Sequence, residues 1–164
     1  MKFSIATFAA ILLVPFFQST NAIQEDDFQL LLGNKWYGSL TYLDYQSQEE
    51  VTLASTVSAE GFDKNPRKGL LTFEYPDEPS ANYQEDIHVN GSGTKLNGQL
   101  VVNRRQLSDG TIRIYTEDEG KDNDKRAIFY YTYEFSETEF SIIKEVQYTD
   151  GSPRFIRNKY SFTR

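Results

Sequence analysis

Four groups of residues in this 164-residue sequence carry side chains that could take part in chemistry. His88 is the single histidine, and a neutral imidazole can act as a general base or ligate haem. The stretch from Glu117 to Asp124 holds five carboxylates, the oxygen ligands that Ca²⁺ prefers. Arg104 and Arg105 could bind a ligand carboxylate, and Asn90-Gly91-Ser92 is an acceptor pattern for N-glycosylation.

Each group also has a simpler interpretation. No nucleophile motif accompanies His88, so we expect an exposed histidine near a strand edge. The acidic stretch lacks the spacing of an EF-hand and contains Lys121, which favours a solvated hairpin loop. We expect Arg104 and Arg105 to face solvent and Asn90-Gly91-Ser92 to form a turn. The sequence therefore predicts no enzyme, no cofactor and no metal site.

The composition excludes several other classes. The chain has 24 Asp and Glu against 17 Lys and Arg, a formal charge of -7, and no cysteine. An acidic field repels phosphate backbones and anionic lipid surfaces, so we expect neither nucleic acid nor a membrane surface as partner. The absence of cysteine rules out disulfides, thiolate metal sites and a cysteine-linked lipid anchor. The sequence gives no indication of the oligomeric state.

Residues 1–22 have the pattern of a cleaved secretory signal. Lys2 supplies a positive start, residues 3–17 are almost wholly apolar, and Thr20-Asn21-Ala22 places small residues before a cut. The apolar run is shorter than the roughly 20 residues needed to span a bilayer, which disfavours a retained anchor. We therefore predict a secreted or periplasmic domain made of residues 23–164.

Most of that domain has the period-two alternation of β-strands. Only residues 23–32 have helical spacing, which predicts a short N-terminal helix ended by Gly33. Nine segments rich in β-branched and aromatic residues follow, separated by turn sequences. The predicted strands are residues 36–45, 51–59, 68–75, 86–89, 95–103, 111–116, 126–135, 140–148 and 154–162.

Short turns between these strands favour antiparallel neighbours. A single flat sheet would leave one apolar face wet and two edges unpaired, so the sheet must close. We therefore predict an all-β, antiparallel, up-and-down barrel of about eight to ten strands, with a β-sandwich as the alternative.

The entry to the first strand resembles a family signature. Gly33-Asn34-Lys35-Trp36 is similar to the Gly-x-Trp motif of the lipocalin and fatty-acid-binding superfamily, the calycins, with one additional residue before the tryptophan. The resemblance implies that Trp36 closes the barrel floor and that a late arginine, Arg157 or Arg154, stacks over it. It also implies that the interior binds a small apolar molecule such as a lipid. In any other β fold, Trp36 would be an ordinary core residue.

Period-two alternation indicates which side chains would line such an interior. The predicted ligand-binding residues share an inward face on three strands: Leu100, Val102, Phe129, Tyr131, Tyr133, Phe135, Phe140 and Ile142. These side chains could equally form a packed core. We therefore expect an exported, non-enzymatic barrel that binds a small hydrophobic ligand. The alternative is a filled barrel or sandwich that contacts another protein or a glycan.

Overall fold

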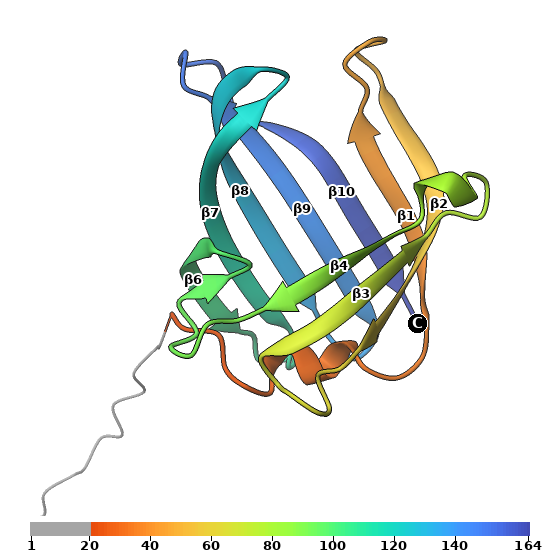
Figure 1. The fold of residues 1–164 in the computed structure, drawn as a ribbon, viewed down its shortest axis with the longest axis vertical. Coiled ribbons are helices and arrows are strands. Elements are labelled where there is room, and N and C mark those ends of the chain that lie inside the picture. The colour runs from red at the N-terminus through yellow and green to blue at the C-terminus, as the bar shows by residue number, and fades with distance from the viewer. Residues whose placement is uncertain (1–20) are drawn as a thin grey trace, which may run out of the picture.

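The computed structural model describes residues 21–164, which form one antiparallel sheet of ten strands curled into a nearly closed barrel (Figure 1). Consecutive strands are neighbours except β4 and β5, which are the two edges of the sheet, and the last strand pairs with the first. The predicted up-and-down barrel is confirmed, and the sandwich alternative is wrong. The strands are β1 (Trp36–Leu43), β2 (Glu50–Glu60), β3 (Lys68–Glu74), β4 (Tyr83–His88), β5 (Lys95–Leu96), β6 (Gln99–Gln106), β7 (Ile112–Asp122), β8 (Lys125–Phe135), β9 (Glu139–Tyr148) and β10 (Phe155–Thr163).

The helical content is smaller than predicted. In place of a helix over residues 23–32 there is a five-residue 3₁₀ helix, η1 (Asp27–Leu31), and Leu32 is already extended. A second 3₁₀ turn, η2 (Pro79–Ala81), leads into β4. No helix in the described part of the chain is long and apolar enough to cross a bilayer. Residues 1–20, which hold most of the predicted signal sequence, lie outside the described residues.

The predicted strand 95–103 is in fact a hairpin. Asn97 and Gly98 both have positive φ angles, 51° and 87°, and reverse the chain between β5 and β6. Asn-Gly is a strong signal for such a two-residue turn, because both residues tolerate the left-handed region. This turn accounts for ten strands where nine were predicted.

The hairpin also reverses two predicted side-chain directions. Leu100 pairs with Glu117 on the outer face of the barrel, and a shift of register follows between Val101 and Asn103. Leu100 is 54% exposed and Val102 is 36% exposed, whereas Val101 is buried. The prediction that Leu100 and Val102 line the interior is therefore wrong.

The barrel has a seam where its two edge strands meet. A single bridge, Val89 to Leu96, connects the end of β4 to β5. Asn97 strengthens the seam: its backbone N–H donates to His88 O at 2.8 Å, and its side-chain amide donates to Asp86 O at 2.8 Å. Beyond the seam, residues 83–86 of β4 and 118–122 of β7 have no further strand partner on their facing edges within residues 21–164.

Inward-facing side chains fill one end of the barrel completely. We call this the closed end, and it is the end across which η1 lies, before the loop that leads to β1 (Figure 1). Its core is aromatic, with Phe28 stacked on Phe62 at 5.3 Å between ring centroids and Trp36 edge-on to Phe140 at 5.9 Å. Trp36 is fully buried. Aromatic and aliphatic packing therefore holds the fold without any disulfide.

Candidate functional site: the open half of the barrel

Trp36 and Arg164 close one end of the barrel together. The indole Nε1 donates to Leu31 O at 3.1 Å, and the Arg164 guanidinium lies 4.0 Å from the ring centroid. The same guanidinium donates to the carbonyls of Leu30 and Leu32 at 2.9 and 2.7 Å, and to Glu137 O at 2.8 Å. The last residue of the chain thus fastens η1 over the floor of the barrel.

Arg164, not Arg157 or Arg154, is the arginine over Trp36. Arg154 instead lies 3.4 Å over the Tyr130 ring. Arg157 lies 4.2 Å over the Tyr45 ring, and its Nε is 3.6 Å from Asp122 Oδ1. The predicted closure role of Arg157 at Trp36 is therefore wrong. Strands β1 and β10 are antiparallel, so Arg157, near the start of β10, lies beside the end of β1, whereas Trp36 begins β1 at the opposite end of the barrel.

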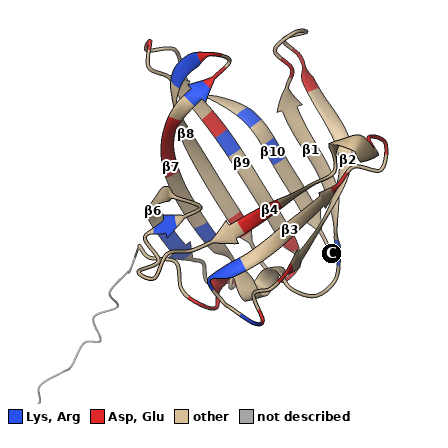
Figure 2. Ribbon diagram, viewed as in Figure 1, with Lys and Arg blue, Asp and Glu red and all other residues tan. Residues whose placement is uncertain are grey.

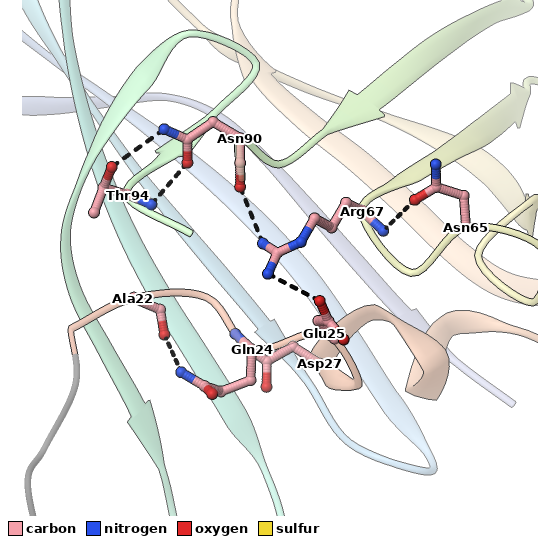
Figure 3. Close-up of polar contacts among 8 residues, drawn as sticks. All are labelled: Ala22, Gln24, Glu25, Asp27, Asn65, Arg67, Asn90 and Thr94. Atoms are coloured by element: carbon pink, nitrogen blue, oxygen red, sulfur yellow. Dashed lines mark hydrogen bonds and ion pairs between the residues drawn. The ribbon is translucent and has the colours of Figure 1, made fainter. Parts of the chain in front are cut away.

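A second set of contacts fixes the N-terminal segment across the closed end (Figure 3). Arg67 donates to Asn90 O and to Glu25 Oε1, both at 3.0 Å, and so joins two loops to this segment. Arg104 forms a two-pronged ion pair with the buried carboxylate of Asp27. The prediction that Arg104 faces solvent is wrong, since the register shift in β6 turns it inward opposite Ile114.

The other half of the barrel is open. Residues opposite each other on paired strands face the same side of a sheet. Leu40 pairs with Leu53 and with the buried Tyr160, and Tyr42 pairs with Val51, so all of these side chains face inward. Leu40, Leu53, Tyr42 and Val51 are nevertheless only half-buried. Solvent therefore reaches the interior at this level, which we call the open half.

Six of the eight predicted ligand-binding residues face inward, at different depths. Phe135 and Phe140 belong to the filled core of the closed end, where their rings meet at 6.3 Å. Tyr133 and Ile142 lie in the layer above and are still buried. Tyr131 is half-buried in the open half, and Phe129 lies beyond it with Ala127 and Val146.

A layer of tyrosines forms the floor of the open half. The Tyr160 hydroxyl lies 2.9 Å from the Tyr75 hydroxyl and 3.0 Å from that of Tyr83. Tyr131 and Tyr133 stack with ring centroids 6.2 Å apart. We call these five residues the tyrosine layer. Burial is the main cause that raises the pKa of each phenol, and for Tyr131 the pKa rises to about 12, so the hydroxyls stay neutral near pH 7.

Two charged residues also face the open half. Glu85 pairs with the buried Leu71 on β3, and burial raises the pKa of its carboxyl. Lys144 pairs with Tyr131, and its Nζ lies 4.1 Å from the Phe129 ring centroid. Burial lowers the pKa of the Lys144 amine. The sequence interpretation missed Glu85 because the predicted strand began one residue later, at Asp86. It missed Lys144 because the inward face of the predicted strand 140–148 was assigned from apolar side chains alone.

The upper rim of the open half carries a further polar cluster. Tyr45 donates a hydrogen bond to Asp122, and the Tyr148 hydroxyl donates to the same carboxylate at 3.0 Å. Arg157 lies beside Asp122 and donates to Leu43 O. These contacts join the β1–β2 hairpin to the β7–β8 hairpin and leave Asp122 well partnered.

The other candidate residues of the sequence analysis do not form a site. His88 is exposed on β4, as predicted, and Asn90 forms a turn in which its side-chain carbonyl accepts from the Thr94 and Lys95 amides. The acidic stretch is mostly strand, because β7 extends to Asp122 and only Asn123 and Asp124 form the turn. Within residues 21–164, no group of three or more histidine, cysteine or acidic side chains is arranged to hold a metal ion.

A hollow of about 910 Å³ lies outside the closed end, beside η1. It is lined by Leu30 and by the polar residues of two hairpins, and the charged groups in its wall, the buried Asp27 and the half-buried Arg104, already pair with each other. The open half of the barrel, where Glu85 and Lys144 have no ion-pair partner among residues 21–164, is therefore the better candidate site.

Comparisons of the sequence with protein-family models and with curated proteins find no match. The ten-stranded, antiparallel, nearly closed barrel is compatible with a calycin-like fold. The positions of Trp36 and Arg164 agree with the closure that the resemblance implied, although the arginine is a different one.

Proposed function

We propose that the protein is an exported, non-enzymatic barrel that binds a small amphipathic molecule in its open half. The observation that carries the proposal is the difference between the two ends of the interior. Side chains such as Trp36 and Phe135 fill one end completely, whereas the inward-facing Leu40, Leu53 and Tyr131 remain accessible to solvent. A closed floor beneath an accessible, largely apolar wall is typical of a small-molecule site.

The side chains of the open half suit a ligand with both an apolar and a polar part. Leu40, Leu53 and Phe129 offer apolar contact, and the tyrosine layer offers hydroxyl groups that donate and accept hydrogen bonds. A long alkyl chain cannot pass the filled closed end. The ligand is therefore expected to be short.

The test is titration with a neutral fluorescent probe, N-phenyl-1-naphthylamine, into the purified protein and three tryptophan variants. Leu53→Trp fills the open half and should weaken probe binding about tenfold or more. Thr52→Trp, next to it on the outer face, and the outward-facing Leu100→Trp should bind as the wild type does. Absence of saturable binding to the wild type, or equal losses in all three variants, would refute the proposal.

The outer face supports a second candidate, contact with another protein or a glycan. Leu100, Tyr130 and Ile156 lie in one row across paired strands on the outside of the barrel. Leu100 and Ile156 are at least half exposed, and Arg154 covers Tyr130. Binding to a glycan array that is lost in Leu100→Asp, combined with no probe binding, would favour this function.

Export is part of the proposal and rests on the sequence pattern of residues 1–22. N-terminal sequencing of secreted material should begin at Ile23. An intact Met1 in a membrane fraction would contradict it.

A further inference from the structure

The carboxyl group of Glu85 faces the barrel interior without an ion-pair partner among residues 21–164. Its side chain faces the interior beside Leu71 and is half-buried. No lysine or arginine nitrogen of residues 21–164 lies within 4.0 Å of its carboxylate, and the Asn97 amide is its one polar neighbour that favours the charged form. A carboxylate removed from water without a cationic partner costs stability. A bound cation would remove that cost.

Tyrosine side chains share the barrel interior with this carboxylate, since Tyr83 lies two residues before Glu85 on the same face of β4 and its hydroxyl lies 3.0 Å from that of Tyr160. The charge of Glu85 acts on four members of the tyrosine layer, Tyr83, Tyr131, Tyr133 and Tyr160, and adds to burial in raising the pKa of each phenol. Aromatic faces that converge on a carboxylate are a recognised arrangement for holding an organic ammonium ion. The barrel interior already holds one ammonium group against aromatic rings, since Lys144 Nζ lies 4.1 and 5.6 Å from the Phe129 and Tyr131 ring centroids.

The charges around the open half favour the entry of a cation. Asp86 lies on the free edge of β4, and Glu117, Asp118 and Glu119 lie along β7 near the facing edge (Figure 2). The whole chain carries a formal charge of -7. Such a field attracts cations and repels carboxylates and phosphates. Lys144 opposes the field locally, and the charges of Asp118 and Asp122 favour its charged form whereas that of Arg157 disfavours it.

We propose that the ligand of the open half is an organic ammonium compound, with its nitrogen at Glu85 against the rings of the tyrosine layer and its apolar part toward Leu40 and Leu53. This inference rests on the proposed binding function and specifies the chemical class of the ligand. Three features agree on it: the carboxylate without an ion-pair partner among residues 21–164, the tyrosine layer that shares the interior with it, and the acidic residues on the facing edges of β4 and β7.

The test compares three ligands of equal chain length at pH 7.5, octylamine, 1-octanol and octanoate, by displacement of N-phenyl-1-naphthylamine. We expect octylamine to bind about tenfold or more tightly than 1-octanol, because a charged hydrogen bond adds to the shared apolar contact, and octanoate to bind most weakly. Glu85→Gln should abolish the advantage of the amine and leave 1-octanol within about twofold. Asp86→Asn removes the same charge from the adjacent, outward-facing residue and should preserve the order of affinities.

Lys144→Met provides a second, opposite perturbation. Removing this internal cation should strengthen the binding of octylamine several-fold, because the repulsion between two ammonium groups is lost. If octanoate instead binds best and Lys144→Met abolishes its binding, the ligand is an anion held by Lys144, and the inference is wrong while the binding function stands. Equal binding of 1-octanol and octylamine likewise overturns the inference alone. Failure of all three compounds and of the probe overturns both proposals.

Discussion

Loss of the Arg164 side chain should destabilise the closed end by an amount that can be worked out from its contacts. Its guanidinium donates to three backbone carbonyls, at 2.7, 2.8 and 2.9 Å, and lies over Trp36. Each hydrogen bond contributes about 0.5–1.5 kcal/mol net and the cation–π contact about 0.5–1 kcal/mol, with the lower values suited to an exposed residue. Arg164→Met should therefore lower the free energy of unfolding by about 2 kcal/mol, or about 6 °C in Tm.

Trp36 is the single tryptophan, so its emission during urea unfolding reports directly on the site of the change. Arg154→Met is the matched control. Arg154 also covers an aromatic ring, Tyr130, but its ion pair with Glu145 is long, at 3.7 Å, and lies on the outer surface. Its loss should cost at most about 1 kcal/mol. Equal costs for the two variants, or a native emission maximum of Trp36 typical of indole in water, would refute the assigned closure.

Three further predictions test the register, the close approach of two strands and the charge in the interior. Val101→Asp should lower the free energy of unfolding in urea by about 3 kcal/mol or more, because it buries a carboxylate, whereas the exposed Leu100→Asp should change the urea midpoint little. The reverse order would mean that the register of β6 is wrong. A Cβ atom at Gly38 would lie 1.9 Å from Ser161 O, so Gly38→Ala should lower the free energy of unfolding, measured by thermal unfolding, by about 2 kcal/mol or more. A Cβ atom at Gly91 meets nothing within 4 Å, so Gly91→Ala should change that free energy by at most about 0.5 kcal/mol. Burial raises the pKa of Glu85, so its ionisation destabilises the folded state as pH rises; Glu85→Gln should therefore increase the free energy of unfolding at pH 8 and have no effect at pH 3, and a decrease at pH 8 would contradict this reasoning.

The class and topology of the fold followed from the sequence because they depend on features that repeat along the whole chain. Alternating apolar residues and short turns recur at every strand, so an error at one strand does not alter the up-and-down order. Side-chain directions are less robust. One unrecognised turn at Asn97-Gly98 reversed Leu100 and Val102, because a shift of one residue moves every side chain to the other face.

The missed residues of the candidate site have a common physical origin. Glu85 and Lys144 are charged, and alternation of apolar residues cannot place a charged side chain inside a barrel. Arg164 lies at the last residue, 128 positions from Trp36, and only the pairing of β10 with β1 brings the two together. The acidic residues after Glu117 gave no strand signal of their own, because pairing with β8 stabilises that part of β7.

The seam between β4 and β5 determines how stiff the barrel is. A barrel whose strands are hydrogen-bonded around the whole circumference resists a change of diameter. Widening it would stretch or break the hydrogen bonds between at least one pair of strands. Here the ring is joined by one bridge and by the bonds of Asn97, so β4 can move outward with β3 while the pairing of the other strands is preserved. The part of the barrel wall that deforms most easily is therefore the part made by β3 and β4. We expect the amide protons of residues 83–89 to exchange with solvent faster than those of β8 and β9. We also expect the diameter of the open half to adjust to the size of a bound ligand.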